Sequence, residues 1–241
     1  MSQLMEESSE TSPATLPMTP VLVTAATKWE AEPLAKGLGL SPSGAGRWEG
    51  NVGGRRVVLA KTGMGASRTT ALLSKDFVAG DFGLALSAGL CGAMNADVRL
   101  GDIVADPAEA EIELVRPLRE TAKALGLAFH FGRIMHTNVV LTPDLKRKFG
   151  EEQRAVACDM ETAAVRRWAA PKTATIGVRV VLDELDETLP SDAPDGEDAA
   201  SLARFALTHA ASLPSLIGTG LRTGRAMKTL SKFLKAYLEA I

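Results

Sequence analysis

Short apolar runs alternate with amphipathic runs along most of the chain. The apolar runs predict buried strands at residues 21–26, 55–61, 84–87, 101–105, 154–158 and 173–182. Residues 44–51 predict a hairpin with 55–61, and residues 130–140 are strand-like. Helical periodicity lies at residues 29–38, 68–78, 113–125, 162–170, 198–213 and 222–240. This alternation predicts an α/β fold, a single-domain three-layer sandwich around a mixed, mostly parallel twisted sheet.

Length and composition fit one large α/β domain or two small ones. The 241 residues are 46% hydrophobic and 23% charged, as in ordinary globular proteins. Residues 1–18 are rich in Ser, Thr, Glu and Pro, which predicts a disordered tail before a folded domain at 19–241. Residues 184–197 are acidic, contain two prolines and predict a loop.

Charge and cysteine usage narrow the class of protein. A formal net charge of -2 argues against a nucleic-acid binder, because the footprint of such proteins is basic. Cys91 and Cys158 lie in apolar, strand-like surroundings and predict reduced, buried thiols, which favours the cytoplasm. No basic region opens the chain before Lys28, and no run of 18 apolar residues occurs, so we expect neither a signal peptide nor a membrane span.

The stretch around which the chain is organised is Ala157 to Val165, which contains Asp159-Met160-Glu161. It joins a predicted strand to a predicted helix, and open α/β sheets bind ligands at such carboxyl ends of strands. Plain helix chemistry gives another explanation, since Asp159 suits an N-cap and Glu161 suits a first helical turn. Glu30 and Asp183 also stand just beyond predicted strands, so three acidic positions share this placement.

Two glycine-containing segments also come directly after predicted strands. Residues 62–67 read Thr-Gly-Met-Gly-Ala-Ser, and residues 88–93 read Ala-Gly-Leu-Cys-Gly-Ala. Such segments either let a ligand approach the backbone or pack a helix closely on the sheet. A dinucleotide fingerprint would need a third glycine where Arg68 stands, which disfavours a nucleotide-dependent oxidoreductase. His130 and His136 have no carboxylate between them and make a poor metal site.

Four stretches in order resemble the purine nucleoside phosphorylase and uridine phosphorylase superfamily. The resemblance is closest to the branch of 5′-methylthioadenosine/S-adenosylhomocysteine (MTA/SAH) nucleosidase and the hopanoid-associated nucleoside phosphorylases. The stretches are residues 21–30, 57–66 with Thr-Gly-Met-Gly, 87–104 with the glycine turn and Gly-Asp-Ile-Val, and Asp159-Met160-Glu161 with the later Arg-Val-Val-Leu-Asp at 179–183. The family cleaves the N-glycosidic bond of nucleosides.

The resemblance implies a role for each matching residue. Asp183 matches the acid that protonates the purine at N7, and Glu30 matches the carboxylate that activates a water. Glu161 matches the carboxylate that accepts both ribose hydroxyls and opposes the developing ribosyl cation. The remaining expected substrate contacts are Met160 under the sugar, Gly92 and Leu90 in the glycine turn, and Asn138 and Val139 at the base. Gly63, Gly65 and Arg68 form the expected loop for phosphate or water.

Departures from the family pattern bear on the nucleophile. Leu90 cannot donate the hydrogen bond that a phosphorylase needs for phosphate, while Glu30 is retained. This combination favours hydrolysis, although the backbone of Gly63 to Gly65 with Arg68 or Lys28 leaves a phosphate site open. Leu182 stands where the family usually has a serine before the acid, which removes a partner of Asp183.

The sequence therefore predicts a cofactor-free purine nucleosidase that binds no metal and uses water on a 5′-substituted adenosine, of the MTA/SAH type or an adenosyl-lipid. Phosphorolysis, with inorganic phosphate as co-substrate, is the alternative within the family. A non-catalytic nucleoside-binding protein on the same fold is the alternative from another class. The resemblance also implies a homodimer or larger homo-oligomer, and we expect no nucleic-acid partner.

Overall fold

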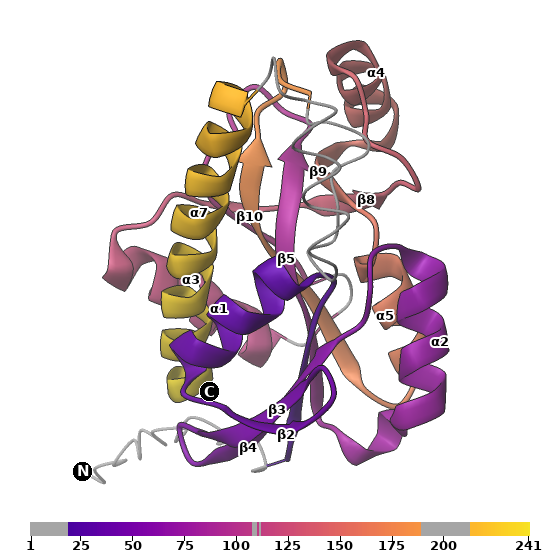
Figure 1. Ribbon diagram of the computed structural model, residues 1–241, viewed down its shortest axis with the longest axis vertical. Helices are drawn as coiled ribbons and strands as arrows, with labels where there is room; N and C mark the ends of the chain where they lie inside the picture. The colour runs from indigo at the N-terminus through magenta and orange to yellow at the C-terminus, as the bar shows by residue number, and fades with distance from the viewer. Residues whose placement is uncertain (1–18, 108–109, 111, 189–212) are drawn as a thin grey trace, which may run out of the picture.

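The computed structural model describes residues 19–107, 110, 112–188 and 213–241 (Figure 1). The side chains of 213–219 are outside this description. The predicted tail at 1–18, the helix predicted at 198–213 except for its last residue, and most of the loop predicted at 184–197 lie outside the described residues.

A twisted mixed sheet runs through the molecule in the order β2-β3-β4-β1-β5-β10-β6-β7. Its four central strands, β4, β1, β5 and β10, are all parallel, and β3 and β6 flank them antiparallel. The last part of β5 also pairs with β9, which pairs with β8. The strand bounds are β1 Val21–Ala25, β2 Ser41–Gly44, β3 Arg47–Val52, β4 Arg55–Lys61, β5 Leu84–Ala93, β6 Ile103–Asp106, β7 Phe129–Phe131, β8 Arg133–His136, β9 Ala155–Asp159 and β10 Ala174–Asp183.

Helices cover both faces of the sheet, as Figure 1 shows. On one face α1, α3 and α7 pack against the apolar side chains of the central strands. On the other face α2 and α5 pack against each other over a smaller apolar cluster. The helix bounds are α1 Lys28–Leu38, α2 Ala66–Asp76, α3 Ile112–Leu125, α4 Pro143–Gln153, α5 Thr162–Ala169 and α7 Leu213–Ala240, with a short 3-10 turn η1 at Ala79–Asp81.

Alternating side chains explain why the central strands are mostly apolar on both faces. Val21 and Val23 of β1 face the α1-α7 layer, and Leu22 between them faces the α2-α5 layer. A strand that is covered on both faces needs apolar residues at every position, which is the signature of a parallel sheet. The predicted α/β class with a mostly parallel sheet between helical layers is confirmed.

Several elements differ from the sequence-based expectation. The β2 strand was not predicted, and α7 begins at Leu213 although its start was expected at residue 222. The β5 strand continues beyond residue 87 to Ala93, so the glycine turn of residues 88–93 is itself part of a central strand. The strand-like run at 130–140 is divided into β7 and β8, and residues 137–140 lie beyond β8. The α4 helix was not predicted, because few of its eleven residues are apolar and only Lys146 and Gly150 are buried.

The four parallel strands end at one edge of the sheet, and the acidic positions lie there. Glu30 follows β1, Gly63 and Gly65 follow β4, and Asp183 ends β10. This edge is where open α/β sheets bind ligands. No helix in the described part of the chain is both long enough and apolar enough to cross a membrane.

Candidate active site

Glu30 lies in the first turn of α1 and is only 4% exposed. Its Oε2 accepts hydrogen bonds from the backbone N and the hydroxyl of Thr27, at 2.9 and 3.0 Å, which closes a capping box. Its Oε1 accepts the backbone N–H of Leu90 at 2.8 Å. Leu90 therefore contributes a main-chain donor to Glu30, and its apolar side chain gives no hydrogen bond.

Gly89 allows Glu30 to approach the strand β5. A Cβ on residue 89 would overlap Glu30 Oε1 and stand 2.6 Å from Nη1 of Arg179. Both side chains thus lie against the bare Cα of this glycine. The requirement for glycine at position 89 follows from this close contact.

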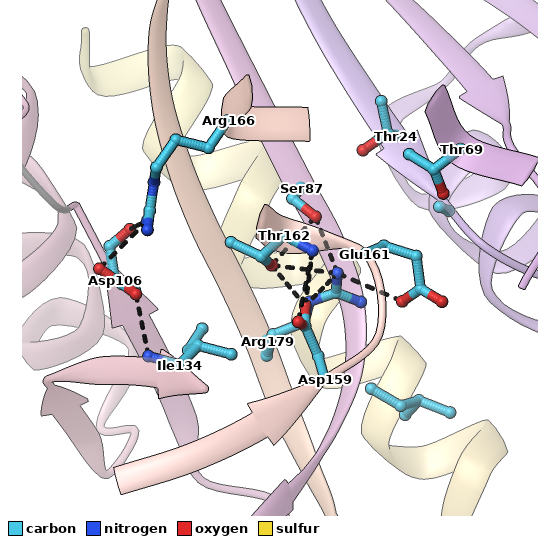
Figure 2. A network of polar contacts seen from close by, with 12 residues as sticks. Thr24, Thr69, Ser87, Asp106, Ile134, Asp159, Glu161, Thr162, Arg166 and Arg179 are labelled. Atoms are coloured by element: carbon cyan, nitrogen blue, oxygen red, sulfur yellow. Dashed lines mark hydrogen bonds and ion pairs between the residues drawn. The ribbon is translucent and has the colours of Figure 1, made fainter. Parts of the chain in front are cut away.

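A buried guanidinium, that of Arg179 on β10, joins the acidic stretch to the sheet (Figure 2). The side chain is 1% exposed. Its Nη2 lies 2.5 Å from Asp159 Oδ2 and 3.6 Å from Glu161 Oε2. The same nitrogen donates to the hydroxyls of Ser87, at 2.7 Å, and Thr162, at 3.2 Å. Burial opposes the charge on Arg179, but the surrounding carboxylates outweigh it and raise its pKa.

Within the described part of the chain, Nη1 and Nε of Arg179 have no hydrogen-bond partner. Buried donors of this kind are nearly always paired with protein or with ordered water. Since Nη1 lies against Gly89 beside Glu30, the geometry leaves a donor and a carboxylate next to each other. A small polar molecule between them would satisfy both groups.

Glu161 is the N-cap residue of α5 and connects α5 to the loop of residues 62–65 after β4, here called the glycine loop. Its Oε1 accepts the backbone N–H of Gly65 at 2.8 Å. Burial raises the pKa of Glu161 to about 7; Arg179 opposes this rise, and the nearby charges of Asp159 and Glu30 add to it. Asp159, the other acid of the stretch, accepts the backbone N–H of Thr162 and anchors the start of the helix.

Asp183 reaches the site through an irregularity in β10. The pairing of β10 with β5 shifts after Val181, so that Asp183 stands opposite Gly92 and Leu182 is the extra residue. Bulges of this kind re-aim side chains near active sites. A Cβ on Gly92 would lie 2.9 Å from Asp183 Oδ2, so the carboxyl packs directly on this glycine. Burial raises the pKa of Asp183, against the lowering effect of the Lys146 ammonium with which it pairs.

The other expected contacts lie around this centre. Met160 is half-buried between Asp159 and Glu161. Residues 137–139 begin beside Asp159, because the backbone N–H of Thr137 donates to the Asp159 carbonyl at 2.8 Å. Asn138 and Val139 are exposed, and Asn138 Oδ1 contacts His136 Nε2 at 3.1 Å.

The glycine loop is already engaged within the protein. The N–H of Gly63 donates to the Ala26 carbonyl at 2.9 Å, and the N–H of Gly65 donates to Glu161. The aliphatic part of Arg68 packs on Gly63. These contacts leave the loop with fewer backbone donors for an anion than the sequence suggested.

Two residues at this site had no role assigned from the sequence. Arg179 belonged to a recognised motif, and a single arginine inside a β-branched run was the available signal. Lys146 lies in the unpredicted helix α4, and no pattern marks it as buried. Among the described residues, no three His, Cys, Asp or Glu side chains come together in a way that could hold a metal ion.

Comparison with known proteins bears on the fold and on the first part of the chain. A family model described as the phosphorylase superfamily matches residues 20–105, which contain β1, the glycine loop and the glycine turn. The resemblance noted from the sequence is thereby confirmed.

Solved structures extend the likeness to the whole fold. MTA/SAH nucleosidase from Campylobacter jejuni has a TM-score of 0.68 at 18% identity, over 93% of this chain and 100% of that one. Futalosine hydrolase from Helicobacter pylori has 0.67 at 16%, over 92% and 100%. The Helicobacter pylori MTA/SAH nucleosidase bound to butyl-thio-DADMe-Immucillin-A has 0.69 at 17%, over 93% and 99%. At these identities the likeness shows a shared phosphorylase-type fold.

Gly89→Ala tests the close packing at Glu30. The added methyl group overlaps Glu30 Oε1, so we expect a loss of about 1–3 kcal/mol in the free energy of unfolding, typical of overpacking. Urea unfolding measures it. The control is Gly224→Ala, whose Cβ meets no atom within 4 Å and which should be neutral or stabilising. Equal effects at the two positions would contradict the described contact.

Glu161→Gln tests the raised pKa of Glu161. The pKa of Glu161 is higher in the folded state than in the unfolded state. The contribution of Glu161 to the stability of wild type is therefore lost as the pH rises from about 4.5 to about 7. Glutamine does not titrate, so the stability of the variant relative to wild type should improve between pH 5 and pH 8. Denaturant unfolding at both pH values measures the difference. A difference that does not change with pH would show that the pKa of Glu161 is not raised.

Proposed function

We propose that this protein is a purine nucleosidase that hydrolyses the N-glycosidic bond of a 5′-substituted adenosine and releases the free base. The observation that carries the proposal is the convergence of Glu30, Glu161 and Asp183 on the final half of β5. Glu30 accepts the backbone N–H of Leu90, and Asp183, opposite Gly92 in the sheet, packs on that glycine. Glu161 lies near Arg179 of β10, and the guanidinium of Arg179 also packs on Gly89 of β5. The phosphorylase-superfamily match and the nucleosidase-like fold support an enzyme of this class.

Glu161 is suited to hold the ribose. Its carboxylate is fixed by Gly65 and Arg179, and an ionised carboxylate accepts hydrogen bonds from two adjacent hydroxyls. Its negative charge also stabilises the positive charge that develops on the ribosyl ring as the bond to the base breaks. Met160, the neighbouring residue, provides an apolar contact for the sugar.

Asp183 is suited to protonate the departing purine. Its burial raises its pKa, which favours the protonated form that a general acid needs near neutrality. It lies two positions along β5 from the main-chain contact of Glu30, so the proton donor and the water-activating carboxylate lie along one short stretch of strand. Asn138 and Val139, exposed beyond β8, are proposed to border the base.

Water is favoured over phosphate by the charges around Arg179. Three carboxyl groups, those of Glu30, Asp159 and Glu161, surround one guanidinium. A phosphate dianion placed among them would be repelled by roughly 4 kcal/mol per pair of unit charges at about 4 Å and an effective dielectric constant of 20. A neutral water can instead accept from Arg179 Nη1 and donate to Glu30, which would take its proton during attack on C1′.

The 5′ side of the substrate is proposed to be apolar. Trp29 and Met64, direct neighbours of Glu30 and of the loop glycines, are 48% and 36% exposed. Helicobacter pylori MTA/SAH nucleosidase was solved with a ligand that carries a butyl-thio group. An MTA-like or SAH-like thioether, or an adenosyl-lipid, would suit such a rim, and a second copy of this chain could cover it in a homodimer.

Product analysis with a nucleoside panel tests the proposed reaction. Adenosine, 5′-methylthioadenosine, S-adenosylhomocysteine and inosine are incubated with the protein, with and without inorganic phosphate. We expect free adenine and a ribose that keeps its 5′ substituent from the 5′-substituted adenosines, at a rate that phosphate does not increase. Chromatography identifies the products. A ribose 1-phosphate product, 5′-substituted or not, would show phosphorolysis, and no cleavage of any riboside in the panel would favour a nucleoside-binding protein.

Asp183→Asn tests the general acid. An amide cannot supply the proton, so we expect kcat on the best purine riboside to fall at least ~10²-fold, the lower range for general acid catalysis. The free energy of unfolding should also fall, because the buried ammonium of Lys146 loses the carboxyl group with which it pairs. Kinetics are therefore measured at a temperature where both proteins are folded. Asp144→Asn, at a carboxylate with 98% exposure on α4, is the control and should keep wild-type kcat.

A further inference from the structure

Lys146 is a buried lysine whose surroundings require it to be charged. It belongs to α4 and is 1% exposed. Its Nζ contacts Asp183 Oδ2 and the carbonyl oxygens of Glu184 and Glu187, each of these two at 2.7 Å. Three acceptors need three N–H donors, which an ammonium has and a neutral amine lacks. A cation is therefore fixed on one oxygen of the proposed general acid.

The residue before Asp183 suggests what the contact between Lys146 and Asp183 does. In the resembled family a serine usually precedes the acid, whereas this chain has Leu182, which is buried and has no hydroxyl. The donor that the acid lacks from its own strand is here supplied from another element, α4. The lysine donates to Oδ2, so the other oxygen, Oδ1, is the one from which a proton can pass to a bound base.

We propose that Lys146 is a positioning residue that directs the proton of Asp183 to Oδ1 and stabilises the carboxylate that remains after the proton has moved to the purine. This inference rests on the proposed function. In the step, the C1′–N9 bond breaks, its electron pair enters the purine, and the Oδ1 proton goes to N7. The water oxygen bonds to C1′ and its proton goes to Glu30. Lys146 keeps its own three protons and pairs with the Asp183 carboxylate.

The charged groups that face Asp183 decide the direction of its pH response. Lys146 lowers the pKa of Asp183, and Glu187 raises it. Cys158 of β9 and Cys91 of β5 also face it, but burial raises the pKa of Cys158 to about 12 and that of Cys91 well above its usual value, so both stay neutral near pH 7. The Glu184 side chain is turned toward Arg99. Loss of Lys146 should therefore raise the pKa of Asp183.

The test is the variant Lys146→Met, measured on two substrates with the same 5′ group. One is the purine riboside that wild type cleaves best, and the other is a p-nitrophenyl riboside, whose leaving group needs no protonation. We expect kcat on the purine riboside to fall about ten- to hundredfold, the loss expected for a hydrogen bond to a charged group. Release of p-nitrophenolate should remain within about twofold, and the alkaline limb of kcat/KM for the purine riboside should move to higher pH.

Three further variants separate this role from a structural one. Lys148→Met, an exposed lysine on the same helix, is the matched control and should behave as wild type. Lys146→Met/Leu182→Ser places a serine directly before Asp183 and should recover part of the kcat that Lys146→Met loses. If Lys146→Met does not fold, Lys146→Gln keeps an amide donor without the charge and should show the same shift of the alkaline limb.

Two results would overturn the inference. Equal losses on both substrates with an unmoved alkaline limb would mean that Lys146 only fastens residues 184–187 to α4. Unchanged kcat in Lys146→Met on the purine riboside would mean that Asp183 needs no cation. If wild type releases the base from no riboside, the proposed function fails first and this inference falls with it, which the wild-type assay shows before any variant is made.

Discussion

The structure of this site depends on one buried cation, the guanidinium of Arg179. It lies on a central strand and touches Asp159, while Glu161 lies near it and its charge acts on that of Glu30. Removing one partner from a buried ion pair typically destabilises a protein by about 3–5 kcal/mol, because the remaining charge is left uncompensated. The acidic stretch can therefore keep its place over the sheet only as long as Arg179 is present. The positive charge of Arg179 also explains how the carboxyl groups of Asp159, Glu161 and Glu30 can lie close together in a buried site.

The parallel sheet supplies the second constraint, because it brings residues that are far apart in the sequence close together in space. Glu30, Gly65 and Asp183 are separated by up to 153 positions, the difference between 183 and 30, yet they follow or end parallel strands at one edge of the sheet. Glu161 follows β9, which pairs antiparallel with the end of β5. Glycines at 89 and 92 remove the Cβ atoms that would keep Glu30 and Asp183 away from β5. Ser87 and Thr162, which are small and hydroxylated, fill the space beside Arg179 and donate or accept without adding charge. The carboxyl groups with proposed catalytic roles thus lie where glycines let side chains pack directly on the backbone of β5.

Most of the fold could be predicted from the sequence, and the reason is physical. Strands covered on both faces are mostly apolar, so β1, β10, most of β4 and the first part of β5 stand out as apolar runs. The α4 helix does not stand out, because it buries a lysine and a glycine instead of an apolar stripe. At the candidate site, Glu30, Glu161 and Asp183 were predicted through motifs at strand ends. The Arg179–Asp159 pair was not predicted, since spacing along the chain does not say which buried charges meet. The glycine loop was expected to face a ligand; its Gly63 and Gly65 N–H groups are instead used by Ala26 and Glu161.

Leu182 and Lys146 show how a missing partner can be replaced from a distant part of the chain. A hydroxyl donor placed directly before an acid is rigid and neutral. An ammonium that arrives from α4 is charged, and it also binds two carbonyl oxygens of the segment after β10. A neutral donor orients the carboxyl group, but a cation additionally stabilises its ionised form, so the two solutions differ in how strongly they favour transfer of the proton to a base. Because the same lysine fastens the segment that follows Asp183, the proposed proton transfer and the position of that segment depend on a single side chain.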